Sequence, residues 1–349
     1  MAQPNHDPVA GDVLGAYLRS QATAFLRGLR LHATSGPDLA RSGHAARRLR
    51  GAARRISGSL TTFRGVTESG WSDGLRTELV WLSSTLADEH AYADRLARLL
   101  DALHRLSHPP ELPVPRNTAG PAGTGGPAGT GSTGTGSTGA AGAAGALTVG
   151  CARAGALLER RLTPARTRAH SATLQALGSA RFHAVADAVA VLASEVPLEP
   201  VAARGRAREV LVPMAAAAQE RLAAAVAALP DPGGAHRYHA DHDGSWHEVR
   251  RLLRLHRYAR EALGEAGARL AEAGEALDRH RDAAGAAAAS AAAARTPRIA
   301  PATAYALGVL HADQRHEVEA ARSAFHRIWS PPPERNPATA PAPAASVTP

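Results

Sequence analysis

Two stretches decide the fold class of this chain: RRLRGAARRISGSLTTFR, residues 47–64, and HEVRRLLRLHRYARE, residues 247–261. Each sets arginines three or four positions apart on an apolar background, which is the spacing of an amphipathic α-helix. Because similar patterns occur in two halves of one chain, they predict a duplicated helical domain. We expect the two arginine faces to address one shared polyanion.

The first stretch gathers its arginines on one face when residues are placed about 100° apart. That face holds Arg47, Arg48, Arg50, Arg54 and Arg55. The opposite face is apolar, and no acidic residue stands between positions 38 and 68. Like charges one helical turn apart repel by a few tenths of a kcal/mol per pair, so an unpaired arginine face costs stability.

The second stretch follows the same plan. One face holds His247, Arg250, Arg251, Arg254 and Tyr258, and Arg257 lies in the same helix. A solvated charged face is the ordinary explanation for one amphipathic helix. Two such faces in one chain favour a ligand instead, since guanidinium groups bind phosphate oxygens through paired hydrogen bonds.

The composition also favours a polyanionic partner. The 349 residues include 40 basic residues, all of them arginine, against 31 acidic ones, and the net charge is +9. Such a balance favours polyphosphate, nucleic acid or an anionic membrane surface. Aromatic residues make up only 4%, which argues against stacking surfaces for single-stranded nucleic acid. The single cysteine, Cys151, excludes an internal disulfide framework and a cysteine-based zinc site.

Targeting signals are not evident in the sequence. The N-terminal residues MAQPNHDPVAGDV lack the basic and apolar regions of a signal peptide. No window approaches about 18 uninterrupted apolar residues, the length that indicates a membrane span. We therefore expect a cytoplasmic protein with no membrane partner.

Segments rich in proline and glycine divide the chain. We expect a disordered N-terminus at 1–11, a first helical-bundle half at 12–109, a flexible linker at 110–146, a second half at 147–329, and a disordered Pro/Ala tail at 330–349. The linker contains PAGTGGPAGTGSTGTGSTGAAGAAG, which cannot bury enough apolar surface to offset its ordering entropy. Strand signals are nearly absent, so the predicted fold class is all-α. Pro164 is expected to separate a helix at 147–162 from another at 164–177.

The chain resembles the CHAD domain, the conserved-histidine α-helical domain associated with polyphosphate, over about residues 12–330 without the linker. The second half carries most of the resemblance, because residues 247–258 follow the family's His-x-x-Arg-Lys/Arg-x-x-Lys/Arg-x-Arg-Tyr pattern. ALDRHRD, residues 276–282, is similar to the family's Leu-Gly-x-x-x-Asp turn, and SARFHAV, residues 179–185, to its Ser-x-Arg-Tyr segment. The matching residues of the first half are Arg50, Arg54, Arg55, Phe63 and Arg64.

The first half departs from the family pattern at two places. Arg47 stands where the family has its first histidine, and ADEHAYAD, residues 87–94, replaces a Gly-x-x-Arg-Asp-x-Asp segment. We therefore expect the first half to be a diverged copy that contributes less to binding than the second half.

The resemblance implies two four-helix bundles related by pseudo-twofold symmetry, with a basic groove that binds inorganic polyphosphate and could associate with polyphosphate granules. The groove residues would be Arg47, Arg48, Arg50, Arg54, Arg55, His247, Arg250, Arg251, Arg254, Arg257 and Tyr258. It implies no cofactor, no metal and no catalytic residue. Relatives often carry a CYTH domain, whose Glu-x-Glu-x-Lys signature is absent from a chain without lysine.

Three alternatives stay open at the level of sequence. The groove could bind nucleic acid or an acidic protein, because contacts to a phosphate backbone need no aromatic residues. The chain could also be a degenerate helical scaffold that has lost its ligand. The loop HRYHADHDGSWH, residues 236–247, offers histidines and aspartates as zinc or nickel ligands, although a solvated polar loop explains it better. We find no P-loop, no nucleophile elbow and no convincing carboxylate pair, so we expect no catalysis.

Overall fold

The computed structural model describes residues 7–34, 39–107, 137–230 and 239–330. Within these residues the chain forms ten α-helices and no strand, which confirms the predicted all-α fold. Disorder was predicted for residues 1–11, for the linker and for residues 330–349, and of these residues 1–6, 110–136 and 331–349 lie outside the described residues. The prediction is wrong for the end of the first segment, because α1 begins at Ala10 and both Ala10 and Gly11 are buried.

The helices follow one another with short 3₁₀ turns at Arg64–Val66 and Ala240–His242. Their bounds are α1 Ala10–Thr34, α2 Leu39–Thr62, α3 Ser69–Ser107, α4 Ser137–Leu177, α5 Ala180–Ser194, α6 Pro200–Ala203, α7 Ala207–Ala227, α8 Asp243–Ala262, α9 Ala268–Ala294 and α10 Pro301–Trp329.

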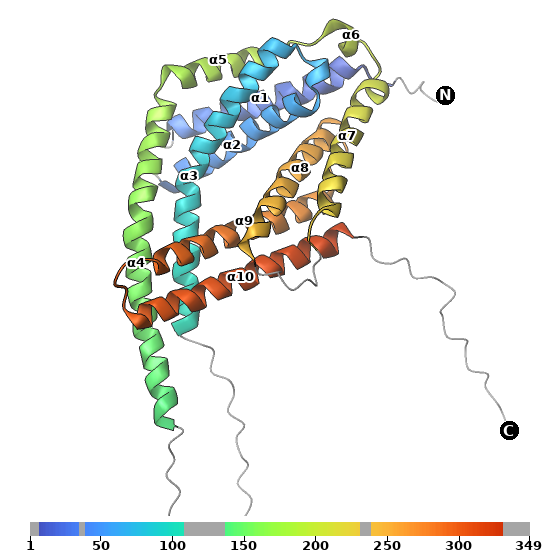
Figure 1. Cartoon of the computed structure of the whole chain (residues 1–349). Helices are drawn as coiled ribbons and strands as arrows, with labels where there is room; N and C mark the ends of the chain where they lie inside the picture. Colours follow the sequence, from blue (N-terminus) through green and yellow to red (C-terminus); the bar gives the residue numbers. More distant parts are fainter. Residues whose placement is uncertain (1–6, 35–38, 108–136, 231–238, 331–349) are drawn as a thin grey trace, which may run out of the picture.

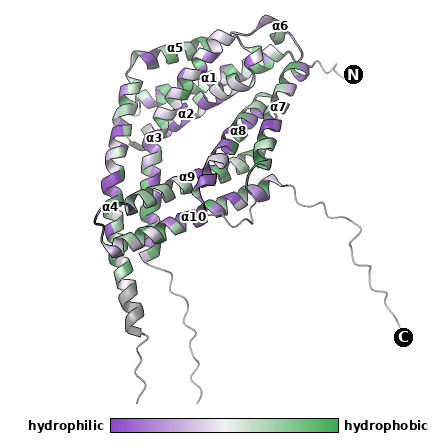
Figure 2. Ribbon diagram, viewed as in Figure 1, coloured by the Kyte–Doolittle hydropathy of each residue, from purple (hydrophilic) through white to green (hydrophobic). Residues whose placement is uncertain are grey.

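Two long helices join the ends of the molecule. The chain runs through α1 and α2 into α3, which lies side by side with α4 (Figure 1). Helix α5 packs across α1, whereas α9 and α10 pack along each other and cross α3 and α4 (Figure 1). Helices α7 and α8 close the remaining side. Most of the long helices carry both hydrophobic and hydrophilic residues, as expected for amphipathic helices around shared cores (Figure 2).

The buried side chains form three main clusters. The largest takes residues from α1, α2, the first part of α3, α5, α7 and the end of α8. A second joins the end of α3 to α4, α9 and α10, and a third lies among α7, α8, α9 and α10. The packing is therefore not divided along the predicted boundary between 12–109 and 147–329, because α5, α7 and α8 complete the core of the first helices. Pseudo-twofold symmetry between the halves stays a prediction.

Two features of α4 differ from what the sequence predicted. The helix begins at Ser137, so the last ten residues of the predicted linker, 137–146, are helical. Alanines in this stretch favour the helix and offset its glycines. The helix also continues through Pro164 without a break. Pro164 is exposed, so the carbonyl group that loses its intrahelical partner can be hydrated, while packing against α3 holds the helix together.

By length and composition, α7 is apolar enough to cross a membrane, and the bent pair formed by residues 145–177 and 180–194 passes the same test together. All three helices also supply buried side chains to the cores described above. Core helices of globular proteins share this composition.

Candidate functional site

A pocket of about 510 Å³ lies where α2, α3, α8 and α9 meet. Arginines outnumber carboxylates in its lining by seven to three, so its electrostatic potential is positive. The arginines are Arg50 and Arg54 from α2, Arg95 and Arg98 from α3, Arg250 and Arg254 from α8, and Arg281 from α9; the carboxylates are Asp88, Asp94 and Asp282. We call this site the arginine pocket.

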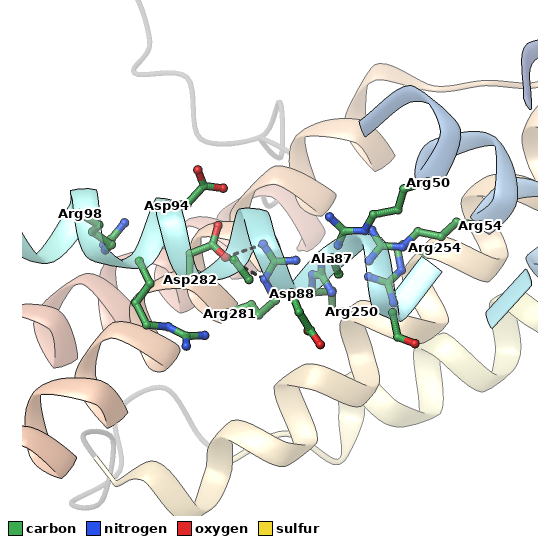
Figure 3. Close-up of a pocket in the computed structure, with 13 residues that line it drawn as sticks. Arg50, Arg54, Ala87, Asp88, Asp94, Arg98, Arg250, Arg254, Arg281 and Asp282 are labelled. Atoms are coloured by element: carbon green, nitrogen blue, oxygen red, sulfur yellow. Dashed lines mark hydrogen bonds and ion pairs between the residues drawn. The ribbon is translucent and has the colours of Figure 1, made fainter. Parts of the chain in front are cut away.

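The guanidinium groups are not spread evenly. Figure 3 shows those of Arg50, Arg54, Arg250 and Arg254 gathered at one end of the pocket. Asp94, Arg98 and Asp282 lie toward the other end (Figure 3). Helices α2 and α8 thus present arginines to the same pocket, as their matching sequence patterns predicted.

Burial and mutual repulsion act on this cluster together. Burial, followed by repulsion from Arg281 and Arg250, lowers the pKa of Arg50 to about 10. The pKa of Arg54 is lowered to about 10 by burial and then by Arg50. Burial, and then the charge of Arg254, lowers the pKa of Arg250 to about 10. All three groups remain charged at neutral pH, so the folded chain carries their repulsion.

Three of these arginines have no carboxylate partner among the described residues: Arg50, Arg54 and Arg254. The buried Nε of Arg50 and Nη1 of Arg254 have no hydrogen-bond acceptor in the described part of the chain. Leaving a buried donor unsatisfied costs about 1–3 kcal/mol, and more for a charged group. Arg250 differs, because its guanidinium binds Asp278. Arg50 Nε and Arg254 Nη1 therefore stay without an acceptor from the described part of the chain.

Glu261 holds two predicted site residues away from the pocket. Its carboxylate lies 2.8 Å from Arg55 and 3.4 Å from Arg257, and it accepts a hydrogen bond of 3.2 Å from the Tyr17 hydroxyl. Because this one carboxylate pairs with both arginines, they tie α1, α2 and α8 together rather than line the arginine pocket. Tyr258 is buried, and the guanidinium carbons of the same two arginines lie 5.5 and 5.4 Å from its ring centre.

Four further predicted residues also lie outside the arginine pocket. Arg251 forms an ion pair with Glu248 one turn before it, and Arg48 is exposed. Arg47 lines a separate pocket of about 290 Å³ beside His90. His247 has its ring centre 5.6 Å from that of His280, and burial lowers the pKa of its imidazole although the charge of Asp243 opposes this effect. Whether these residues contact a ligand stays a prediction.

The sequence interpretation missed the contributions of α3 and α9. Arg95 and Arg98 line the pocket next to the ADEHAYAD segment that we noted for its divergence, and Arg281 belongs to ALDRHRD. Arg98 also donates a 2.5 Å hydrogen bond to Gln314 of α10. Their nearness to family motifs was the available signal, but nothing in the spacing indicated which helix face would meet α2 and α8.

The loop that the sequence offered as an alternative metal site takes part in a network of ion pairs instead. Asp243 accepts hydrogen bonds of 2.8 Å from Arg315 and 2.7 Å from Arg322, and His280 Nε2 lies 3.5 Å away. Burial alone would raise the pKa of Asp243, but its contacts with His280 and Arg315 outweigh that effect and lower it to about 2. No three histidine, cysteine or acidic side chains gather as a metal site in the described residues, and His236 lies outside them.

A second pocket of about 370 Å³ adjoins the first. The two pockets share Arg54, Ser84 and Arg254, which therefore form a common wall. The rest of its lining combines hydroxyl-bearing and apolar side chains, including Ser83, Val80 and Leu255, with Arg76 and Arg251. These two arginines already form ion pairs with Asp73 and Glu248. We call this second pocket the hydroxyl pocket.

Comparison with known proteins agrees with this architecture. The CHAD domain family model matches residues 22–298. Among solved structures, PptA from Streptomyces chartreusis is 54% identical, with 92% of this chain and 99% of that chain covered and a TM-score of 0.72. The CHAD domain from the plant Ricinus communis is 19% identical over 93% of this chain and 94% of its own, with a TM-score of 0.55, and supports the fold alone. No curated protein matches the chain. The chain therefore belongs to the CHAD domain family.

Proposed function

We propose that this protein binds inorganic polyphosphate in the arginine pocket without catalysing a reaction. The observation that carries the proposal is the cluster of half-buried guanidinium groups of Arg50, Arg54 and Arg254, which two helices contribute and which have no carboxylate partner among the described residues. Polyphosphate presents a negative charge and two free oxygens at each internal unit, so one chain can satisfy several arginines in series. Membership of the CHAD family supports this choice over other anions.

Each part of the pocket has a separate role in this proposal. The four clustered arginines of α2 and α8 make the first bidentate contacts, because their planar forks match phosphate oxygens. Arg95 and Arg98 extend the basic surface along α3. Asp282 is paired with Arg281, so this carboxylate reduces the local charge without excluding a polyanion.

Binding without catalysis fits the chemistry of the lining. Arginine remains protonated at neutral pH and cannot act as a general base. Ser84 is the one hydroxyl residue that lines the arginine pocket among the described residues, and its Oγ donates a 2.8 Å hydrogen bond to the Trp81 carbonyl. No basic side chain among the described residues hydrogen-bonds to this hydroxyl, so we assign it no nucleophilic role.

The test is a titration of long-chain polyphosphate and duplex DNA, each at two salt concentrations. We expect polyphosphate to bind more tightly at both, and both affinities to fall as salt rises. The double variant Arg50→Ala with Arg54→Ala should lose at least about tenfold in affinity, since charge-assisted hydrogen bonds contribute about 1.5–3 kcal/mol each. The matched control is Arg153→Ala with Arg160→Ala, which removes two exposed charges from α4 and should change affinity little.

The two halves of the site can be compared in the same assay. The sequence predicted a larger loss from Arg250→Ala with Arg254→Ala, on the assumption that Arg251 and Arg257 act with them. Glu248 and Glu261 hold those two arginines, and Asp278 already engages Arg250. We therefore now expect the Arg50 and Arg54 pair to lose at least as much affinity.

Three outcomes separate the alternatives. Equal affinity for DNA and polyphosphate would favour a general polyanion binder. Loss of affinity in the α4 control as large as in the pocket variants would place binding elsewhere. No binding of either polyanion by the folded protein would leave the degenerate scaffold as the better explanation.

A further inference from the structure

The hydroxyl pocket differs in chemistry from the arginine pocket beside it. Its volume of about 370 Å³ falls in the range of small-molecule sites, roughly 300–1,000 Å³. Apolar side chains form part of its wall: Val80, which is 56% exposed, and Leu255. An inorganic phosphate chain gains nothing from such a wall, because it has no apolar surface to bury.

One hydroxyl of this pocket has no partner. Ser83 is 7% exposed, and its Oγ has no hydrogen-bond partner among the described residues. Two other hydroxyls of the lining differ, because Thr61 donates to the Ser57 carbonyl at 2.8 Å and Ser57 donates to the Arg54 carbonyl at 3.3 Å. A buried hydroxyl left unsatisfied is costly, so a polar ligand group that pairs with Ser83 Oγ would stabilise the complex.

The shared wall links this chemistry to phosphate binding. Arg54 and Arg254 line both pockets. A phosphate group held between these two arginines would therefore have the arginine pocket on one side and the hydroxyl pocket on the other. A ligand that fills both pockets therefore needs a phosphate chain on one side and an uncharged group with apolar faces and polar edges on the other.

We propose that the two pockets together bind a nucleoside 5′-polyphosphate. Its phosphates would cross Arg54 and Arg254 into the arginine pocket, and its nucleoside would enter the hydroxyl pocket. The flat base would pack against Val80 and Leu255, and a base nitrogen or ribose hydroxyl would pair with Ser83 Oγ. No bond is made or broken. This inference rests on the proposed function, because the same arginines hold the phosphates.

The decisive comparison is between ATP and inorganic tripolyphosphate, measured by isothermal titration calorimetry with EDTA present to remove divalent cations. Both ligands have three phosphates, but esterification removes one ionisable oxygen from ATP. Charge alone therefore predicts weaker binding of ATP. We expect ATP to bind about tenfold more tightly, a ratio equivalent to about 1.4 kcal/mol. Equal or weaker binding of ATP would overturn the inference while leaving the proposed function intact.

Variants locate the nucleoside contact. Val80→Gln should abolish most of the ATP advantage and leave the affinity for tripolyphosphate unchanged, because it alters only the apolar wall. Val191→Gln is the matched control, since Val191 is 54% exposed on α5, away from both pockets. Ser83→Ala should lower the affinity for ATP several-fold and leave the affinity for tripolyphosphate unchanged. If Val80→Gln and Ser83→Ala both kept the full ATP advantage, the nucleoside would not lie in the hydroxyl pocket.

Arg54→Ala distinguishes failure of this inference from failure of the proposed function. This variant should weaken the binding of both ATP and tripolyphosphate, since the Arg54 side chain lies in the wall that the two pockets share. If neither ATP nor tripolyphosphate nor long-chain polyphosphate bound to the folded protein, the proposed function and this inference would fall together.

Discussion

Arg54 illustrates how a binding residue can oppose the stability of its own fold. Its charge is buried beside Arg50 and has no carboxylate partner among the described residues. We expect Arg54→Gln to raise the free energy of unfolding by about 1 kcal/mol without ligand, because it removes this repulsion and keeps most of the stem. The same change should weaken polyphosphate binding. Chemical denaturation with and without polyphosphate measures both effects, and a variant less stable than wild type without ligand would contradict the argument.

Asp243, unlike Arg54, stabilises the fold, and this stabilisation should be lost in acid. Its carboxyl has a pKa of about 2 in the folded chain against about 3.9 when unfolded, so its contribution of about 2–3 kcal/mol is complete above about pH 4 and disappears as pH falls to about 2. Asp243→Asn should destabilise the protein by about 3–5 kcal/mol at pH 7, because it leaves Arg315 and Arg322 buried without this charge.

Urea denaturation from pH 7 to pH 2 measures this effect. The gap between wild type and Asp243→Asn should narrow only below about pH 4. Burial lowers the pKa of His280 and the Asp243 carboxylate opposes that effect, so protonation of the imidazole below about pH 6.5 destabilises Asp243→Asn more than wild type. The gap should therefore widen between about pH 6.5 and pH 4 before it narrows. A gap that stays constant down to pH 2 would show that the ionised carboxylate is not what holds the two arginines.

Single residues also mark the limit of what the sequence could predict about the site. Helical spacing correctly placed Arg50 and Arg54 on the face that meets Arg250 and Arg254. The same spacing put Arg55 on that face as well, but Glu261 binds it. A helical wheel describes one helix, and it cannot show a carboxylate that arrives from another helix about 200 positions later.

At the scale of helices, the crossing of α2 and α8 fixes the width of the arginine pocket. Gly58 lets the two helices approach, because a Cβ atom at this position would lie 2.6 Å from Cδ2 of Tyr258. The ring cannot move away easily, since Tyr258 is buried next to Arg55 and Arg257.

We expect Gly58→Ala to destabilise the protein by about 1–3 kcal/mol and to weaken polyphosphate binding, because separating the helices moves Arg54 away from Arg254. The matched control is Gly74→Ala in α3, where a Cβ atom would meet nothing within 4 Å. That change should stabilise the helix by about 0.4–1 kcal/mol and leave affinity unchanged. Thermal unfolding and calorimetry provide the two measurements, and equal effects from both alanines would refute the role of the crossing.

Helix α4 shows why element boundaries were harder to predict than fold class. Amphipathic spacing sufficed to predict helices throughout, and the structure has no strand in its described residues. Local rules placed breaks at the glycine-rich stretch before residue 147 and at Pro164. Packing along α3 carries the helix across both positions, and this stabilisation depends on a neighbour that local rules do not include.

For the whole molecule, the connection between α3 and α4 should be replaceable. Residues 117–136 contain no apolar side chain larger than that of proline. A five-residue Gly/Ser spacer in their place would halve the 29-residue connection between Ser107 and Ser137, which should raise stability by about 0.6 kcal/mol through loop-closure entropy. Thermal unfolding of the shortened protein tests this expectation. A loss of several kcal/mol would show that the replaced residues make stabilising contacts.

The largest core has a consequence for how the protein is made. Its side chains include Leu14 and Leu86 near the beginning of the chain, but also Ala259 and Ala262 at the end of α8. Leu86 and Ala262 are 176 positions apart, so a ribosome adding about 5–20 residues per second needs roughly 10–35 s to supply the last of these side chains after the first helices have been synthesised. During that interval the nascent helices expose apolar surface that nothing yet covers. The nascent chain is therefore most prone to aggregation after its first helices have left the ribosome and before α8 has been synthesised.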